Sequence, residues 1–415
     1  MGTVVARTCV ACGAEPEDPA ALWCPSCGPE GTLDLSYDLE AAGAALRRDL
    51  LDPATPLDSW RFRALLPVAD EGPRPPLRVG PTPLLLVPAE RAPAGLQRLW
   101  VKDEGRNPTA SFKDRATQVA VASALERGVP GLLCASTGNA ATSLAGFCAA
   151  SGLRAVILVP ASAPRPKLAQ LLCYGAELIP VAGTYDDAFD LSLAAAPQLG
   201  LDLRSTGVNP ILGEGKKTAA LELMEQLGWE PPEAISVSVG DGCIISGLYK
   251  GLADLYGAGM IPRIPRLIGV QAAGSDALTQ AWERGDDAPT AISAKTRADS
   301  ISVDLPRDGR KALRAVRESK GCFVRVPDED LLKAQLTLAR CSGVFSEPSG
   351  AASLAGILAL VERGELDPAA PVVALTTGSG LKDTDSALEA GGGVPPAIEP
   401  SLDALLARLQ QQTRG

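Results

Sequence analysis

A lysine inside a polar nonamer is the first residue whose surroundings point to chemistry. The stretch Asn107–Arg115 reads NPTASFKDR, and a helical pattern begins near Ser111, so Lys113 falls in the first turn of a helix. The positive end of the helix dipole disfavours a further cation there, which helps to keep the amine neutral and nucleophilic. Such an amine can form a Schiff base with an aldehyde cofactor. Taken alone, the nonamer fits an exposed lysine paired with Asp114 almost equally well.

A second polar motif follows the apolar run Gly131–Ala135 and opens an alanine-rich helical stretch. It consists of Ser136, Thr137, Gly138 and Asn139. Hydroxyl and backbone N–H groups at a helix N-terminus form a carboxylate site, and the Asn139 amide can also hydrogen-bond a phenolic oxygen. Plain N-capping would need only one of these residues. Four small polar residues together therefore favour a binding site.

A third motif is a glycine turn between an apolar run and a helical pattern, formed by Gly240, Asp241, Gly242, Cys243 and Ile244. Glycines let the backbone close around a phosphate, which then lies on the helix N-terminus. The spacing is not that of a dinucleotide-binding GxGxxG loop. The carboxylate within the turn suits a phosphate dianion only if its side chain turns outward.

A fourth motif, Thr376–Asp383, reads TTGSGLKD and follows the apolar run Val372–Thr376. A hydroxyl at Thr377 could hydrogen-bond a neutral pyridine nitrogen, although the segment also fits an ordinary glycine turn at a strand end. Each of the four motifs suits one part of an adduct between pyridoxal phosphate and an amino acid. Together they are much more specific than any of them alone.

Four cysteines near the N-terminus form a separate pattern. Cys9 and Cys12, then Cys24 and Cys27, make two Cys-x-x-Cys pairs that are each followed by glycine. Two tight knuckles of this kind point four thiolates at one tetrahedral metal, so we predict a structural zinc site. Disulfides are the weaker alternative.

Composition limits the remaining possibilities. The chain has 415 residues and no histidine, which excludes catalysis by Ser-His or Cys-His pairs and zinc sites with imidazole ligands. A net charge of −10 argues against nucleic acid or an anionic membrane as a partner. No apolar run is long enough to span a bilayer and the N-terminus lacks the pattern of a signal peptide, so we expect a cytoplasmic protein.

The pattern of the chain predicts an α/β fold with a largely parallel sheet, because apolar β-branched runs alternate with helical stretches. The expected strands are Leu99–Lys102, Gly131–Ala135, Ala155–Val159, Glu177–Val181, Ile235–Val239, Arg266–Gln271 and Val372–Thr376. The expected helices are Arg115–Arg127, Ala140–Ser151, Arg165–Tyr174, Thr184–Leu199, Thr218–Leu227, Ile244–Leu255, Asp328–Leu338 and Gly350–Arg363. We expect a tail at 391–415 that ends in one or two amphipathic turns.

These motifs, together with Gly80–Leu84 (GPTPL), Gly213–Thr218 (GEGKKT) and Glu347–Ala352 (EPSGAA), resemble threonine synthase and its relatives among the fold-type II pyridoxal-phosphate enzymes. The resemblance runs over nearly the whole chain. It implies two three-layer α/β/α domains beside a zinc-ribbon-like module at 1–38. The larger, cofactor-binding domain would comprise 39–125 and 222–390, and the smaller one 126–221. It also implies a homodimer that acts on a small amino acid.

The resemblance further implies roles for particular residues. Lys113 would carry pyridoxal phosphate and act as general base. The other expected cofactor contacts are Phe112, Asn139, Gly240, Asp241, Gly242, Cys243, Ile244 and Thr377. The expected substrate contacts are Ser136, Thr137, Gly138, Arg115 and Lys217. The implied reaction converts O-phosphohomoserine and water to threonine and phosphate.

Two positions depart from the family pattern. Leu212 stands where threonine synthases usually carry an arginine that could bind the substrate phosphate, and Ser379 stands where they usually carry a histidine. Loss of the arginine weakens phosphate binding unless Lys216, Lys217 or Arg115 compensates. The alternative is therefore a β-elimination or β-replacement enzyme, similar to serine or threonine dehydratases or to synthases that use O-phosphoserine. A non-catalytic member is a third possibility, which the presence of Lys113 disfavours.

Overall fold

The larger of two parallel sheets forms the centre of the protein. The structure is a computed structural model that describes residues 4–412 except 162, 164 and 206. The sheet has the order β11-β10-β9-β12-β4-β3, and only the edge strand β3 runs antiparallel. Its strands are β3 (Leu84–Leu86), β4 (Arg98–Asp103), β9 (Ala234–Ser238), β10 (Arg266–Ala272), β11 (Cys322–Val326) and β12 (Pro371–Thr376).

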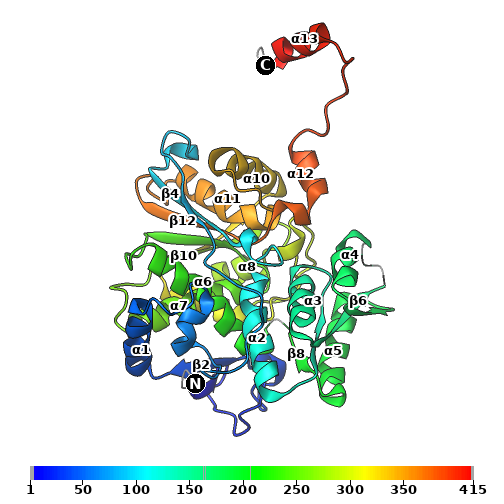
Figure 1. Ribbon diagram of the computed structural model, residues 1–415. Helices are drawn as coiled ribbons and strands as arrows, with labels where there is room; N and C mark the ends of the chain where they lie inside the picture. Colours follow the sequence, from blue (N-terminus) through cyan, green and yellow to red (C-terminus); the bar gives the residue numbers. More distant parts are fainter. Residues whose placement is uncertain (1–3, 162, 164, 206, 413–415) are drawn as a thin grey trace.

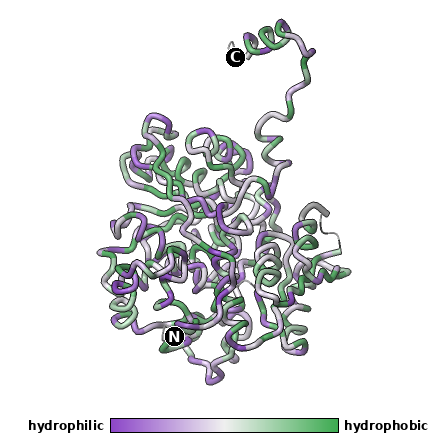
Figure 2. Tube along the Cα trace, viewed as in Figure 1, coloured by the Kyte–Doolittle hydropathy of each residue, from purple (hydrophilic) through white to green (hydrophobic). Residues whose placement is uncertain are grey.

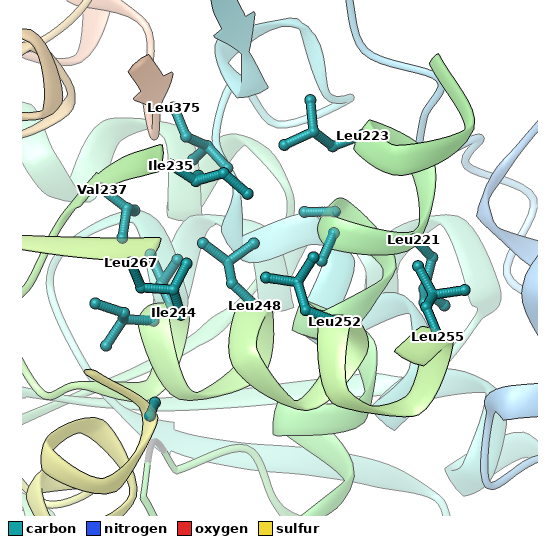
Figure 3. Close-up of a cluster of buried hydrophobic side chains, with 14 of the residues drawn as sticks. Leu221, Leu223, Ile235, Val237, Ile244, Leu248, Leu252, Leu255, Leu267 and Leu375 are labelled. Carbon is teal, nitrogen blue, oxygen red and sulfur yellow. The ribbon is translucent and has the colours of Figure 1, made fainter. Parts of the chain in front are cut away.

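Both faces of this sheet are covered by helices, because successive side chains along its strands are apolar on both sides. Ile235 and Val237 face a core shared with α6, α7 and α9, whereas Ala234 faces a second core shared with α10 and α11. Figure 3 shows the first core, in which the leucines of α7 point toward β9 and α6. The covering helices are α6 (Ile211–Gln226), α7 (Cys243–Gly257), α8 (Ala277–Arg284), α9 (Gly309–Glu318), α10 (Asp328–Ser342) and α11 (Pro348–Glu362), whereas α2 (Lys113–Arg127) packs against α6 and the smaller sheet.

A smaller parallel sheet of order β7-β6-β5-β8 lies beside the larger one (Figure 1). Its elements are β5 (Gly131–Ala135), α3 (Asn139–Ser151), β6 (Arg154–Pro160), α4 (Arg165–Cys173), β7 (Glu177–Val181), α5 (Tyr185–Leu199) and β8 (Asp202–Leu203). Residues 126 and 221, the expected ends of the smaller domain, lie within α2 and α6. Helices, not loose linkers, therefore connect the two sheets.

The N-terminal module is a two-stranded antiparallel ribbon. It consists of β1 (Val4–Cys9) and β2 (Leu33–Tyr37), followed by helix α1 (Leu39–Leu51). The ribbon is attached to the larger domain through polar contacts. The Tyr37 hydroxyl donates to Glu214 of α6 at 2.8 Å, and Lys311 of α9 forms an ion pair with Asp34 at 3.0 Å.

Every helix and strand expected from the sequence is present, with ends that differ by a few residues. The largest difference is α6, which begins at Ile211 instead of Thr218. Its N-cap is Pro210, and the side chain of the preceding Asn209 accepts a hydrogen bond from the Ile211 amide at 3.1 Å. The expectation missed β1, β3, β8, β11, α8, α9 and α12 (Thr384–Ala390), of which β3 and β8 have only three and two residues.

The C-terminal tail contains more helix than expected. After α12 (Thr384–Ala390) the chain leaves the body and ends in α13 (Leu402–Gln412), which carries hydrophobic and hydrophilic residues side by side (Figure 2). Eleven residues make about three turns, where one or two were expected. Within the part of the chain that the structure describes, no helix has the length and apolarity needed to cross a bilayer.

Candidate active site

The lysine motif and the last glycine motif meet at the carboxyl edge of the larger sheet. Lys113 is the first residue of α2 and is half-buried. Just before it, the Phe112 amide donates to the Thr377 carbonyl at 2.8 Å, and the Ser379 amide donates to the Ala110 carbonyl at 3.1 Å. These two bonds hold the start of α2 against the loop after β12, so Lys113 and Thr377 face one site from two strand ends.

Asn139 joins the same site through a carboxylate. Its side-chain amide donates to Glu347 Oε1 at 3.0 Å, and the Glu347 backbone amide donates to the Gly378 carbonyl at 3.1 Å. Asn139 and Glu347 are both buried. Glu347 is the first residue of the EPSGAA motif, one of those that carry the family resemblance, but no role was expected for it. Its place in that motif was the only feature of the sequence that could have drawn attention to it.

Burial gives the two ionisable groups of this cluster unusual acidities. Loss of solvation, with Lys216 and Arg204 nearby, lowers the pKa of Lys113 to about 8, although Glu347 and Asp241 oppose the shift. Loss of solvation raises the pKa of Glu347 to about 7, although the Lys113 charge opposes this shift. Near neutral pH an appreciable fraction of Lys113 is therefore neutral, as a nucleophilic amine must be.

The glycine turn before α7 provides a cradle for an anion. Gly242 has a φ of 92°, and a Cβ there would lie 2.8 Å from the Ala312 side chain, so a larger residue does not fit. The helix geometry leaves the amides of Cys243, Ile244 and Ile245 without intrahelical acceptors. Asp241 Oδ1 accepts a hydrogen bond from the Arg307 amide at 3.3 Å, which engages this carboxylate with the neighbouring loop.

The remaining expected contacts lie at the other strand ends. Ser136, Thr137 and Gly138 are half-buried in the loop before α3, where the Gly138 amide donates to Ser136 Oγ at 3.2 Å. The hydroxyl of Thr377 lies 3.3 Å from that of Ser238 at the end of β9. All four motifs are thus located at strand ends that border one site.

Three expected ligands have other partners in the structure. Arg115 is fully buried and bonds Glu104 at 2.6 Å and Glu222 at 3.0 Å. Lys217 is also fully buried. It forms an ion pair with Asp254 at 2.8 Å, and its ammonium lies 3.9 Å from the centre of the Tyr37 ring.

Both side chains were expected to contact substrate, but in the structure each charge is matched by a carboxylate that lies far away in the sequence. Phe112 is the third residue. Its ring is fully buried in the core, and its backbone N–H and C=O both bond to protein, so it positions Lys113 and offers no polar contact.

Leu212 and Lys216 have different surroundings. The Leu212 side chain is buried in an apolar cluster with Ala116 and Leu144. Lys216 is buried near Lys113, and its charge acts on Asp241 in the glycine turn. Lys216 can therefore place positive charge beside the phosphate cradle.

Several buried polar atoms near this site have no hydrogen-bond partner within the described part of the chain. They are Ser111 Oγ, Ser205 Oγ, and Nη1 and Nη2 of Arg204. Buried polar atoms are normally paired, so these atoms indicate that a polar ligand belongs here. Arg204 was not expected, because a single arginine in a short polar segment gives no sequence signal. Together with the cradle before α7, these atoms fit a phosphorylated cofactor and an anionic substrate.

The four N-terminal cysteines converge, as the spacing predicted. Their sulfur atoms all lie within 4.8 Å of one another, and those of Cys12 and Cys24 are 3.8 Å apart. Four thiolates around a tetrahedral zinc would lie about 3.8 Å apart, given Zn–S bonds of about 2.3 Å. Gly13 and Gly28 have φ values of 75° and 63° and make the turn in each knuckle. The cluster therefore fits a four-coordinate metal.

Comparison with known proteins agrees with this geometry. Residues 76–378 match the family model described as pyridoxal-phosphate dependent enzyme. A threonine synthase of Methanocaldococcus jannaschii is 36% identical, over 98% of this chain and 99% of its own length. One of Mycobacterium leprae is 37% identical, over 81% of this chain and 91% of its own length.

Among solved structures, the processed form of threonine deaminase isoform 2 from Solanum lycopersicum has a TM-score of 0.64 at 23% identity, over 75% of this chain and 83% of its own. This likeness confirms the fold expected from the sequence. The relatives' identity and coverage confirm the resemblance stated from the motifs. The chain belongs to the pyridoxal-phosphate dependent enzymes, among the relatives of threonine synthase.

Proposed function

We propose that this protein is a threonine synthase, which converts O-phosphohomoserine and water to threonine and phosphate. The observation that carries this proposal is the 36% identity to a threonine synthase over nearly the full length of both chains. The net reaction breaks the Cγ–O bond to phosphate, places a hydroxyl on Cβ and leaves a methyl group at Cγ. Such a reaction requires protons to be moved at neighbouring carbons.

The cofactor would be held by residues whose positions have been described. Lys113 would bind it covalently, the amides at the start of α7 and Lys216 would hold its phosphate, and Asn139 and Thr377 would contact its ring. When bound, pyridoxal phosphate supplies an electron sink that makes protons beside the amino group acidic.

The protein's own groups would supply the proton transfers. The lowered pKa of Lys113 lets its amine accept a proton near neutral pH. Glu347 contacts Asn139, and its pKa of about 7 lets it hold or release a proton in the same range. The hydroxyls and amides of Ser136–Gly138 would orient the substrate carboxylate at the start of α3.

The proposed test measures both the cofactor and the reaction. Purified protein should absorb in the near-violet when loaded with pyridoxal phosphate, and Lys113→Ala should remove that band. Lys333→Ala is the matched control, because Lys333 is exposed and pairs only with nearby Asp330. With O-phosphohomoserine the protein should release phosphate and threonine in equal amounts. A band that persists in Lys113→Ala would contradict the assignment of the lysine.

A dehydratase-like eliminase is the second candidate, favoured by Leu212 and Ser379. It would act on serine or threonine and release pyruvate or 2-oxobutyrate. The same substrate screen decides between the two, because an eliminase would form the keto acid and leave O-phosphohomoserine unused.

We further propose that the four cysteines hold a structural zinc ion, since four protein thiolates leave no open position for catalysis. Purified protein should contain one zinc per chain, and Cys9→Ser with Cys24→Ser should release it. A zinc-free preparation in which Cys9 and Cys24 react readily with an alkylating agent would contradict this site. We also expect a cytoplasmic homodimer.

A further inference from the structure

Arg204 is a buried cation that forms no ion pair with the described residues, although the Asp114 charge acts on it from a distance. It follows β8 directly, and its side chain is about 1% exposed. Its Nε donates to Thr117 Oγ1 at 3.2 Å, but Nη1 and Nη2 have no hydrogen-bond partner among the residues that the structure describes. No carboxylate of the described residues forms an ion pair with it. Burial of an unpaired guanidinium is unfavourable, so the arrangement calls for an anion.

The contacts of Thr117 place this guanidinium beside the active site. The Thr117 hydroxyl donates to the backbone carbonyl of Lys113 at 3.1 Å and accepts a hydrogen bond from Ser143 of α3 at 2.7 Å. One hydroxyl group therefore links Arg204 to the first turn of α2 and to α3. The charge of Arg204 also contributes to the lowered pKa of Lys113.

The other anions of the proposed reaction already have sites. The amides at the start of α7, with Lys216 beside them, suit the cofactor phosphate, and the loop before α3 suits the substrate carboxylate. The phosphate ester of the substrate has no such site. The side chain at position 212 lies in an apolar cluster. Arg204 is thus a buried cation with two neighbouring nitrogen atoms, Nη1 and Nη2, that could donate to this phosphate.

We propose that Arg204 binds the phosphate ester of the substrate, with Nη1 and Nη2 donating to two phosphate oxygens. This inference rests on the proposed function. A guanidinium suits a phosphate because its planar fork donates two parallel hydrogen bonds. When the Cγ–O bond breaks, its electron pair remains on the phosphate oxygen, and Arg204 stabilises the negative charge that develops there.

The experiment measures binding of an unreactive phosphonate, in which a methylene group replaces the ester oxygen of O-phosphohomoserine. Protein loaded with pyridoxal phosphate is titrated while the cofactor absorption is recorded. Arg204→Gln should weaken binding by roughly 10- to 100-fold, because a charge-assisted bidentate contact is lost. Arg204→Lys keeps the positive charge but not the planar guanidinium, so its affinity for the phosphonate should lie between those of the unchanged protein and Arg204→Gln. 2-Aminobutyrate, which lacks the phosphonate, should bind all proteins equally.

Two controls separate this effect from a general disturbance. Arg154→Gln removes an exposed arginine of the same domain that pairs with Glu177, and it should bind the phosphonate like the unchanged protein. The affinity for pyridoxal phosphate itself should not change in Arg204→Gln when it is measured well above the pKa of Lys113, where the lysine amine is neutral in both proteins. A selective loss of cofactor affinity would assign the guanidinium to the cofactor phosphate and overturn the inference. Arg204→Lys provides the comparison if the glutamine variant does not fold.

The outcomes distinguish the inference from the proposed function. If the unchanged protein converts O-phosphohomoserine while Arg204→Gln and Arg204→Lys bind the phosphonate as tightly as it does, Arg204 is not the phosphate ligand and the function stands. If the unchanged protein neither converts O-phosphohomoserine nor binds the phosphonate, the proposed function is wrong, and the assignment of Arg204 is wrong with it.

Discussion

Two fully buried arginines, Arg115 of α2 and Arg204 directly after β8, have surroundings that differ. Arg115 lies among Glu104, Glu222 and Thr82, and its guanidinium donates to all three. Glu222 also pairs with the buried Lys102. Arg115 and the two glutamates form a closed network in which each charge has a partner of opposite sign, and such a network positions the start of α2.

The surroundings of Arg204 contain no such partner. Its guanidinium bonds one hydroxyl, and two of its nitrogens remain free. The comparison teaches that burial and charge do not by themselves identify a ligand site. Arg115 was expected to contact substrate because of its place in the motif, yet the protein already satisfies it. Arg204, whose Nη1 and Nη2 have no hydrogen-bond partner among the described residues, lies in a segment in which the sequence showed no motif.

The largest expected effect is a change in the free energy of unfolding, which should differ between substitutions of Arg115 and Arg204. Arg115→Leu should lower the free energy of unfolding by about 3–5 kcal/mol, because it leaves buried carboxylates without their cation. Arg204→Leu should leave the stability of the cofactor-free protein unchanged or raise it, since it removes an unpaired buried charge. Urea unfolding followed by circular dichroism measures both. Equal destabilisation by the two substitutions would contradict the contrast.

A second test concerns position 212, where the family resemblance led us to expect an arginine. Leu212→Arg should destabilise the protein by about 2–4 kcal/mol, because the new charge enters an apolar cluster. It should not improve binding of the phosphonate. Leu212→Met is the matched control and should cost less than about 1.5 kcal/mol. Tighter phosphonate binding in Leu212→Arg would show that position 212 faces the substrate.

The smallest expected effect is a pH dependence. With the pKa of Lys113 at about 8, the neutral fraction of its amine increases from about one tenth at pH 7 to about nine tenths at pH 9. Capture of pyridoxal phosphate by cofactor-free protein should therefore accelerate roughly ninefold over this range and level off above it. Stopped-flow absorbance measures the rate.

The cations around Lys113 should move this transition. Lys216 and Arg204 both lower the lysine's pKa, so Lys216→Gln should shift the midpoint to higher pH. Lys333→Gln should not shift it, because that lysine is exposed and paired with Asp330. A midpoint near the ordinary lysine value of about 10.4 in the unchanged protein would contradict the lowered pKa.

Much of the site could be predicted because it is built from local patterns. An apolar run, a small polar turn and a helix start are adjacent in sequence, so the placement of Lys113, Asn139 and Gly242 at helix N-termini followed from the chain itself. The same holds for the cysteine knuckles. Parallel strands then bring their carboxyl ends to one edge, which is a general property of such sheets.

Whether each buried charge has a partner of opposite sign could not be predicted, because the partners lie far apart in the sequence. Arg115 meets Glu222 across 107 positions, and Lys217 meets Asp254 across 37. Whether Arg204 has a partner likewise depends on the packing of β8 against α2. The early start of α6 was missed because its first turns are rich in glycine, which disfavours helices.

The adjacent residues Lys216 and Lys217 have a consequence for how this protein could be shortened. Neighbouring residues on a helix point about 100° apart, so one lysine acts on the glycine turn while the other lies under Tyr37 of the N-terminal ribbon. A chain that began at residue 39 would lose the tyrosine that covers Lys217 and donates to Glu214. The N-terminal ribbon therefore covers part of α6, and a shortened enzyme would expose Lys217 and Glu214 to solvent on that side.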